Sequence, residues 1–475
     1  MNTRNILNTI VIGTAILLAP GLLNAATEPG TPKKPNIVFV FADQWRAQAT
    51  GYAGDPNLQG KTPHLDKLAT EGIQLINAVS TLPACTPYRG SLMTGQYPMT
   101  HGLFVNDAPL NPDAVTIGKL YKQAGYDTGY VGKWHIDGHG RADFIPKERR
   151  QGFDYWKVLE CTHNYNQSAY YEGDDQTKKY WDGYDAIPQT QDVQRYIKDR
   201  ADAEKPFFMM LSWGGPHNPY QTAPEQYKAM FNPADLKLRD NAKDSKKTRK
   251  DLAGYYAHIA ALDHCMGLLM KTLDETGLRE NTILVFTSDH GDMLGSRGEQ
   301  RKQRPWDESV CVPFLIRYPN RLGATGRIID MPLGTPDIAP TLLGLSEIPV
   351  PDTMEGDDFS RVFTGEEKAT NDAALIQSLI PFGEWSRGGG REYRGIRTRR
   401  YTYVRDLKGP WLLYDNAKDP YQQKNLIDQP DSAGLVKELD AQLTAKLKKN
   451  NDDFRPGTEY LKKWGYVLEK GKIKI

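Results

Sequence analysis

The stretch NIVFVFAD, residues 36–43, is the first of five apolar runs whose composition is typical of strands buried on both faces of a sheet. The other four runs are residues 126–135, 206–213, 282–290 and 312–319. Helix-like segments lie between the runs, and this alternation predicts an α/β fold in which helices sandwich a large, mostly parallel sheet.

Two segments between these runs carry strong helix signals. Residues 62–72 begin with Thr62, a good capping residue, and Pro63, which suits the first turn, and they end at a glycine. Residues 252–277 repeat apolar side chains at steps of four and three, which makes one apolar stripe along a long helix. Cys265 borders that stripe, so we expect it to be a packing residue.

The composition of the sequence changes after Leu345. Residues 346–372 are polar and contain several Pro and Asp residues, which is typical of a connecting segment. This segment would join a large domain, residues 27–345, to a smaller C-terminal domain, residues 373–475.

The smaller domain has its own pattern of elements. Residues 393–404 alternate like one strand, residues 411–415 can pair with it, and residues 431–450 have the period of an amphipathic helix. The sequence therefore predicts a C-terminal α+β domain that carries an antiparallel sheet.

The first 26 residues are typical of a secretory signal peptide, because Arg4 precedes an apolar run from Ile6 to Leu23 that ends in small residues. The alternative of a spanning anchor is disfavoured, since the run is short for a bilayer. We expect export, to the bacterial periplasm or the medium, with no membrane anchor once the signal is removed. The 60 basic and 59 acidic residues balance, which argues against nucleic acid as a partner.

Polar residues follow directly on four of the apolar runs. In an open parallel sheet the ligand crevice lies beyond the carboxyl ends of the strands, so these side chains should converge on one crevice. They are Asp43 and Gln44, Lys133 and His135, His217, and Asp289 and His290. If the strand continues through GKWH, residues 132–135, Lys133 and His135 share one face.

The oxygen donors of this set suit a divalent cation. Asp43, the Gln44 amide and Asp289 are typical ligands of calcium or magnesium. The softer imidazole of His290 leaves manganese or zinc open. Lys133, His135, His217 and Lys302 would stabilise an anionic group and move a proton to its leaving oxygen.

Cys85 lies where a helix can begin, with Pro87 in the first turn and Arg89 nearby, so its side chain would lie at the positive end of the helix dipole. Two interpretations remain open on these grounds, a thiolate nucleophile and a buried thiol without chemistry. A cysteine-based phosphatase loop is excluded, because the three residues between Cys85 and Arg89 are too few to wrap a phosphate.

The segment CTPYRGSLMTGQ, residues 85–96, resembles the signature of the type I sulfatases of the alkaline phosphatase superfamily, in which the cysteine is oxidised to formylglycine. Seven further segments recur in the order of that family: NIVFVFADQ, TPHLDKLATEGI, GYVGKWH, GGPHNPY, TSDHGDMLG, DESVCVPFLIRYP and DIAPTLLGL. The resemblance implies an exported hydrolase of a carbohydrate sulfate ester, modified by a formylglycine-generating enzyme.

The resemblance also implies a role for each site residue. The metal, most simply calcium, would be held by Asp43, Gln44, modified Cys85, Asp289 and His290. The catalytic residues would be Cys85 as the nucleophile, Arg89 beside its aldehyde hydrate, His135 as base, His217 as acid to the leaving alcohol, and Lys133 and Lys302 on the sulfate oxygens. Arg301 or Arg304 could replace Lys302, because the segment around it departs from the family pattern.

Two alternatives and several specificity candidates remain at this point. Gln44 and His290 in place of more usual ligands resemble the branch with phosphonate monoester hydrolases, so phosphodiester or phosphonate substrates are an alternative, and a non-catalytic binder of sulfated glycans is another. Residues 159–167 and 382–395, the latter with Trp385 and Arg387, are candidates for sugar contacts. We expect His101 and His139 to be structural. At most one disulfide can form among Cys161, Cys265 and Cys311.

Overall fold

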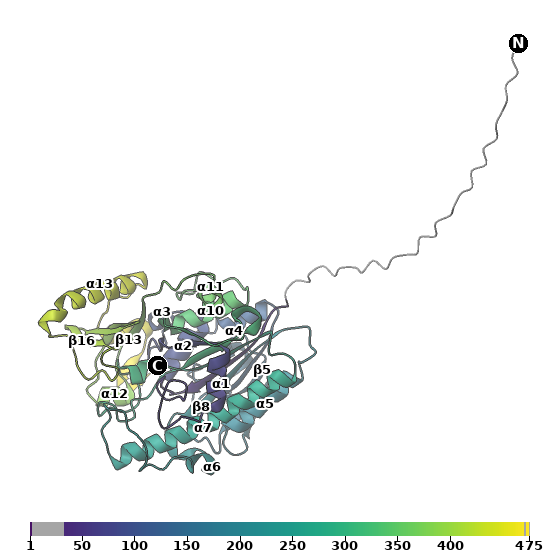
Figure 1. Cartoon of the computed structure of the whole chain (residues 1–475), viewed down its shortest axis with the longest axis horizontal. Helices are drawn as coiled ribbons and strands as arrows, with labels where there is room; N and C mark the ends of the chain where they lie inside the picture. Colours follow the sequence, from purple (N-terminus) through teal and green to yellow (C-terminus); the bar gives the residue numbers. More distant parts are fainter. Residues whose placement is uncertain (2–32, 470–471, 475) are drawn as a thin grey trace. The chain divides into compact units, whose positions relative to one another are not determined.

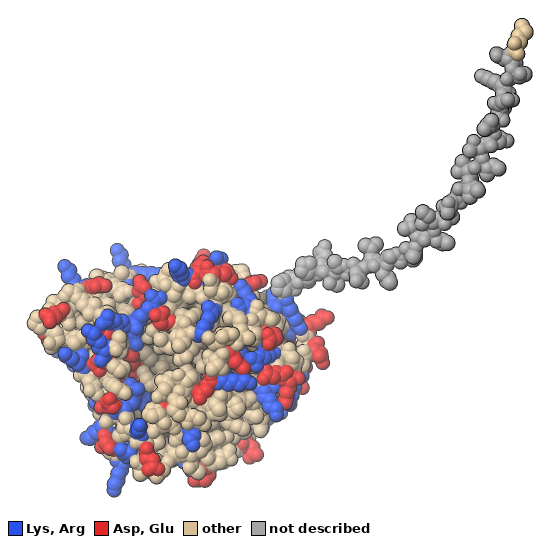
Figure 2. Space-filling view, viewed as in Figure 1, with Lys and Arg blue, Asp and Glu red and all other residues tan. Residues whose placement is uncertain are grey.

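The computed structural model describes Met1, residues 33–469 and residues 472–474, so the predicted signal peptide beyond Met1 lies outside the described residues. Residues from Lys34 onward form one compact unit. No helix in this described part is long and apolar enough to span a bilayer. On the face drawn in Figure 2, basic and acidic side chains are interspersed.

A ten-stranded sheet organises the chain, in the order β11-β2-β10-β9-β1-β8-β4-β5-β6-β7. Its centre is parallel and contains β9 (Thr282–Ser288), β1 (Asn36–Asp43), β8 (Phe207–Pro216), β4 (Asp127–Lys133) and β5 (Tyr155–Leu159). The outer strands are β11 (Arg327–Ile329), β2 (Ile73–Leu75), β10 (Phe314–Arg317), β6 (Ala169–Glu172) and β7 (Asp175–Tyr180). The predicted α/β class with a mostly parallel sheet is confirmed.

One strand in this sheet differs from the prediction. The apolar run 312–319 was expected to be parallel, but β10 lies antiparallel to β9. The residues between β9 and β10, 289–313, contain one short α-helix, α8 (Asp307–Val310), and no long helix that crosses the face of the sheet, whereas parallel neighbours are usually joined by such a crossover helix.

Both faces of β1 are buried, which explains its unbroken apolar composition. Ile37, Phe39 and Phe41 belong to one hydrophobic cluster, and Val38 and Val40 belong to another on the opposite face. The first cluster includes side chains of α2 (Cys85–Thr94), α4 (Ile117–Gln123) and α10 (Ile338–Leu345). The second includes α1 (Pro63–Glu71), α5 (Ala186–Lys198) and α7 (Lys246–Glu275), so helices cover both faces (Figure 1).

The predicted helix at 62–72 is confirmed as α1, but Thr62 does not cap it with its side chain. The carboxylate of Asp263, from α7, accepts the backbone N–H groups of His64 and Leu65 instead. A residue almost two hundred positions away therefore satisfies the first turn of α1, which no local pattern could predict.

The second sheet is antiparallel, in the order β13 (Ala373–Ser378), β14 (Tyr393–Thr398), β15 (Tyr401–Asp406) and β16 (Gly409–Asp415). Residues 393–404, predicted as one strand, are thus two strands of a hairpin that turns at 399–400. The helix α13 (Ala433–Lys449) packs Leu439, Leu443 and Leu447 against this sheet. After α13 in the chain come α14 (Gly457–Trp464), β17 (Val467–Glu469) and β18 (Lys472–Lys474).

Shorter elements complete the described chain. They are β3 (Ala78–Val79), α3 (Pro98–His101), α6 (Glu225–Lys228), α9 (Pro319–Leu322), β12 (Leu333–Gly334), α11 (Ser360–Thr364) and α12 (Gly383–Arg387). The α11 helix lies inside the predicted connecting segment 346–372. The proposed domain borders stay a prediction, because the residues from Lys34 onward cluster as one unit.

Candidate functional site

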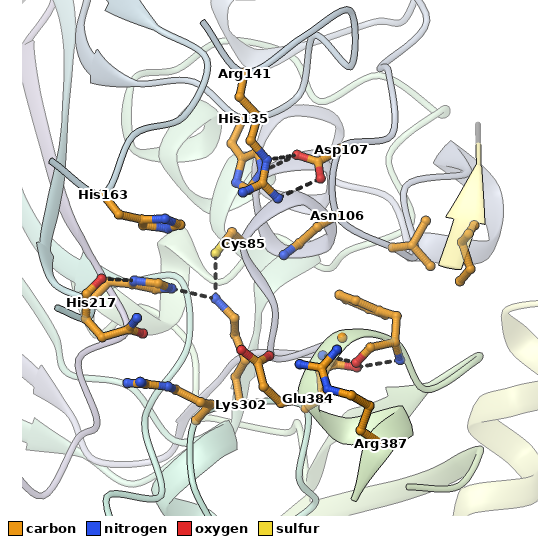
Figure 3. Close-up of a pocket in the computed structure, with 17 residues that line it drawn as sticks. Cys85, Asn106, Asp107, His135, Arg141, His163, His217, Lys302, Glu384 and Arg387 are labelled. Carbon is orange, nitrogen blue, oxygen red and sulfur yellow. Dashed lines mark hydrogen bonds and ion pairs between the residues drawn. The ribbon is translucent and has the colours of Figure 1, made fainter. Parts of the chain in front are cut away.

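The carboxyl ends of β1, β4, β8 and β9 meet the first turn of α2. Asp43 and Lys133 are the last residues of β1 and β4, His217 directly follows β8, and Asp289 directly follows β9. Cys85 is the first residue of α2, as predicted. Cys85 and His217 line a cavity of about 530 Å³, drawn in Figure 3. Asp43 and Asp289 lie beside Cys85, and Lys133 contacts Asp43, so the structure brings the predicted residues together.

Four donors at the floor could hold a metal ion. One ligand atom each of Asp43, Cys85, Asp289 and His290 lies within 4.8 Å of the others, and all four residues are buried. The Nδ1 atom of His290 lies 2.9 Å from the Gly291 carbonyl, which can only accept, so Nδ1 carries the proton and Nε2 presents a lone pair. This donor set suits a divalent cation.

Gln44 completes the set through an atom without a partner. Its Nε2 donates to Asp292 Oδ2 at 2.7 Å and its backbone N–H to Asp289 Oδ1 at 3.0 Å, at a positive φ of 72°. Its Oε1 is buried and has no hydrogen-bond partner among the described residues. A buried amide oxygen without a donor is costly unless a cation takes that place. The site therefore fits a divalent metal with Gln44 as a fifth ligand.

The sulfur of Cys85 lies among cationic and acidic groups. Lys302 Nζ is 3.0 Å away, His290 Nε2 3.4 Å and Asp43 Oδ1 3.6 Å. Burial and Asp43 raise the pKa of the thiol, but Lys133, Lys302 and His290 together bring this pKa well below its ordinary value. The site is therefore built to hold negative charge at the position of the sulfur.

Lys302 uses its three N–H donors on three partners of the site. Besides Cys85, its ammonium lies 3.1 Å from His217 Nε2 and 3.2 Å from His290 Nε2. Burial lowers the pKa of Lys302, but Cys85 and Asp43 raise it overall. Of the two alternatives for its role, Arg301 contacts the Tyr220 hydroxyl and Arg304 lies over the ring of Trp385. The ammonium of Lys302 is thus the one placed against Cys85.

Two further cations hold the acidic groups. Lys133 Nζ lies 2.5 Å from Asp43 Oδ2, and Arg89 donates to Ser212 Oγ and the Lys133 carbonyl at 2.8 Å each. Arg89 Nη2 also bridges Asp43 and Asp289 at 3.5 and 3.3 Å. Burial raises the pKa of Asp43, but Lys133 and other neighbouring basic groups lower it well below its usual range, so the carboxylate is charged.

His217 is oriented by its neighbours. Its Nδ1 lies 2.8 Å from the Asn218 carbonyl, so Nδ1 carries a proton and Nε2 faces the ammonium of Lys302. Burial and Lys302 hold the pKa of His217 well below its ordinary value. The ring of His163 stacks on it, with centroids 4.6 Å apart and an angle of 6° between the rings. Figure 3 shows these two imidazoles on one side of the cavity.

His135 lies past the end of its strand, which corrects the expectation that GKWH continues β4. The strand ends at Lys133, and His135 has a positive φ of 61°, so strand alternation does not orient it. Its Nε2 lies 2.9 Å from Asp107 Oδ1, and Arg141 binds the same carboxylate with two N–H groups at 2.9 and 2.7 Å. Burial lowers the pKa of His135, but Cys161 and Asp107 raise it well above its ordinary value.

Sequence reasoning missed several residues of the cavity. Asp107 and Asn106 come from a loop with no strand or helix pattern, and Arg141 from another such loop. His163 was within the predicted contact segment 159–167, but its stacking on His217 was not foreseen. Asp292, which holds the Gln44 amide, had a signal, since it closes the SDHGD motif.

The second specificity candidate, residues 382–395, stays a prediction, and its two named side chains lie in different places. Arg387 lines the cavity, but Trp385 is buried beneath it, packed against Arg304, and is not available to stack on a sugar. His101 is buried and bonds Ser91, and His139 contacts Asp137, so neither lines this cavity. All four cysteines are free and buried, and Cys265 packs in the helical layer as predicted.

Comparison with known proteins accounts for this constellation. The chain matches the model of the Sulfatase family over residues 35–348 and that of the N-sulphoglucosamine sulphohydrolase C-terminal region over residues 295–449. It is 45% identical to an ulvan-active sulfatase of Formosa agariphila, over 98% of this chain and 91% of the relative. It is 32% identical to an endo-4-O-sulfatase of Bacteroides thetaiotaomicron, over 88% and 93% of the two chains.

A solved structure agrees with this assignment. A protein in complex with its substrate D-glucosamine-2-N,6-O-disulfate superposes with a TM-score of 0.78 and 25% identity, over 90% of this chain and 99% of the other. The resemblance seen in the sequence is thus confirmed over most of the chain. The chain belongs to the sulfatase family, and it is an enzyme of that family.

Proposed function

We propose that this sulfatase is exported and hydrolyses a sulfate ester of a sulfated carbohydrate, with a nucleophile made from Cys85. The observation that carries the proposal is the position of the Cys85 sulfur, 3.0 Å from the Lys302 ammonium and beside the donors of Asp43 and His290. A group at that position faces both an anion-binding cation and a metal-type donor set, which is what attack on a sulfate requires.

Formylglycine at Cys85 would supply the nucleophile, and a divalent cation would supply charge neutralisation. Oxidised to formylglycine and hydrated, the Cys85 side chain would provide the attacking oxygen and a second oxygen that later releases sulfate, while a divalent cation, most simply calcium, would neutralise charge on both. Asp43, Gln44, Asp289 and His290 would hold the cation. The buried and unpartnered Gln44 oxygen supports this set.

The residues of the chain would divide the remaining work. Lys133 and Lys302 are the buried ammonium groups beside the metal-type donors, and they would hold the sulfate oxygens. Arg89 would fix the hydrated group at Cys85 through its helix turn and its contact with Asp289. These cationic groups do not have to move during the reaction, because hydrogen bonds and ion pairs with their partners already hold them in position.

The two imidazoles would move protons at opposite sides of the sulfate. His217 presents Nε2, the nitrogen not fixed by the Asn218 carbonyl, and this atom would take a proton from the Lys302 ammonium, 3.1 Å away, and pass it to the leaving alcohol. His135 donates Nε2–H to Asp107, and in the neutral form of the ring its buried Nδ1, which has no hydrogen-bond partner among the described residues, would accept a proton from the hydrated group.

The cavity supports a sugar substrate. Its volume of about 530 Å³ suits a ligand of the size of one or two sugar rings. The exposed guanidinium of Arg387, at its mouth, has no ion pair among the described residues and could bind a further anionic group of the substrate. The relatives named for ulvan and for a sulfated glucosamine act on sulfated sugars, which favours the same class here.

Export and maturation belong to this proposal. Residues 1–26 would direct the chain to the periplasm or medium and be removed, and a formylglycine-generating enzyme would modify Cys85 on the way. No membrane anchor would remain.

Sulfate release from a panel of sulfated mono- and oligosaccharides tests the proposal. Wild type and Cys85→Ala are expressed together with a formylglycine-generating enzyme, and mass spectrometry of the Cys85 peptide verifies the aldehyde. We expect release by the wild type alone. A modified enzyme that hydrolyses phosphodiesters or phosphonates but no sulfate ester would transfer the function to the alternative substrate class.

A further inference from the structure

The last described strands of the chain reach the catalytic cavity, although they lie beyond both matched family regions, the later of which ends at residue 449. Ile473, in β18, lines the cavity together with Val105 and Phe382. In Figure 3 this strand, in yellow, lies on the side of the cavity away from His163 and His217. The hairpin of β17 and β18 is thus part of the wall that a substrate would meet.

The segment before the hairpin is anchored on the loop that follows α3. The Tyr466 hydroxyl donates to the Gly102 carbonyl at 3.2 Å, and its ring lies 5.4 Å from that of Phe104. Gly102 has a φ of 81°, and a Cβ there would meet the Trp464 ring at 2.5 Å. Only glycine allows this approach, so Trp464 and Tyr466 fit closely against this loop.

This loop carries residues of the reaction site. Three positions beyond Gly102 lies Val105, and Asn106 and Asp107 follow, all in the cavity wall. Asp107 binds His135 at 2.9 Å. The anchoring of Trp464 and Tyr466 therefore supports both the wall and the carboxylate that holds the proposed base.

The apolar part of the wall has a chemical consequence. Val105, Phe382 and Ile473 belong to one continuous hydrophobic cluster, and they are the uncharged, non-polar side chains among the residues that line the cavity, apart from Cys85 and a glycine. They face a floor of cations and imidazoles. A pyranose ring has an apolar C–H face as well as polar hydroxyls, and this wall fits the C–H face.

We propose that the β17–β18 hairpin is a specificity wall in which Ile473 contacts the C–H face of the sugar ring that bears the sulfate or of its neighbour. This inference rests on the proposed function, since it assigns a further contact to the same site. It predicts that Ile473 contributes to sugar binding equally in the ground state and the transition state, and not to the chemical step.

The test compares Ile473→Ala with Leu468→Ala. Leu468 pairs directly with Ile473 across the hairpin and is 49% exposed, and it does not line the cavity, so it controls for damage to the hairpin itself. The substrates are the panel oligosaccharide that the wild type hydrolyses best and 4-nitrophenyl sulfate, which lacks a sugar ring.

For Ile473→Ala we expect KM for the oligosaccharide to rise about tenfold with kcat unchanged, and kcat/KM for 4-nitrophenyl sulfate to change less than about twofold. Leu468→Ala should change neither. An equal loss of kcat/KM on both substrates, or an equal loss in both variants, would contradict a sugar contact at Ile473. Neither result would contradict the sulfatase function.

A second measurement does not depend on turnover. In hydrogen exchange of the full chain, Tyr466→Ala should raise exchange of the amides at 102–107 about tenfold relative to the wild type, and Leu468→Ala should leave it unchanged. If the wild type hydrolyses no sulfate ester, the proposed function fails, and this measurement alone decides: unchanged exchange at 102–107 rejects the hairpin as a support of the cavity wall.

Discussion

The Lys302 ammonium donates to the Cys85 sulfur over 3.0 Å, and these residues come from segments more than two hundred positions apart. The same ammonium contacts His217 and His290, so one cation links the proposed nucleophile, the proposed acid and a proposed metal ligand. Loss of this side chain should therefore affect the reaction more than the fold.

Lys302→Ala should lower kcat for sulfate release about 10²- to 10³-fold, because an anion-stabilising donor is removed from a buried site. Arg301→Gln is the matched control, since this neighbour lines the cavity but contacts Tyr220, and it should cost less than about tenfold. Steady-state kinetics checks both. A larger loss for Arg301→Gln would assign the role to that residue.

Cys85→Ala should abolish sulfate release, with a loss of at least about 10³-fold, because the proposed nucleophile is made from this side chain. The fold should persist, since the thiol is a small buried group and Ala fits its place. Circular dichroism and thermal unfolding serve as controls. Substantial release by a well-folded Cys85→Ala protein would contradict a nucleophile at this position.

Calcium added to chelator-treated protein should raise Tm by about 5 °C or more, because a ligand that binds only the folded state stabilises it. Gln44→Leu should reduce this shift, since it removes the unpartnered oxygen near Asp289 but keeps the size of the side chain. Differential scanning calorimetry measures the shift without any need for turnover. Equal shifts in both proteins would remove Gln44 from the ligand set.

Asp263 should make stability depend on pH. Burial raises the pKa of this carboxyl to about 7 in the folded protein, while the unfolded chain has the ordinary value. Its contribution is thus fully present below the unfolded pKa of about 4 and is lost as the pH rises through 7, since the folded form binds the extra proton. The Tm of the wild type should therefore fall relative to the Tm of Asp263→Asn as the pH rises from 5 to 8.5. A difference between the two Tm values that does not change with pH would contradict this role.

Arg387→Ala should raise KM about tenfold for substrates with a second anionic group and leave substrates without one within about twofold, because this guanidinium at the cavity mouth has no ion pair with any residue that the structure describes. Arg387→Lys keeps the charge and should recover part of the loss. Paired substrates with a free and an esterified carboxylate make the comparison. Equal effects on both members of a pair would exclude ion pairing.

The sequence predicted the floor of the site better than its walls. Asp43, Lys133 and Asp289 end or follow strands whose apolar composition marks them as buried, and strand ends meet at one edge of a parallel sheet. His135 was located but its orientation was not, because a positive φ interrupts the strand period. Asp107 carries no local pattern, so only the folded loop places it beside His135.

In the fold, too, features set by local composition were predictable and features set by distant pairing partners were not. The strand β1 is predictable because its two faces meet different helix layers and every residue must be apolar. The direction of β10 and the turn inside residues 393–404 depend on pairing partners rather than on composition, and the sequence pattern alone led to wrong expectations for both.

The burial of Cys85 also sets an order of events. The residue is 1% exposed, and the segment that closes over it carries Lys302 and follows β9, a strand that pairs with β1. A chain synthesised as far as α7 still lacks that closing segment. Any enzyme that oxidises this thiol must therefore reach it while folding is incomplete, so slower docking of β9 would lengthen the interval for modification and faster docking would leave more inactive, permanently enclosed thiol.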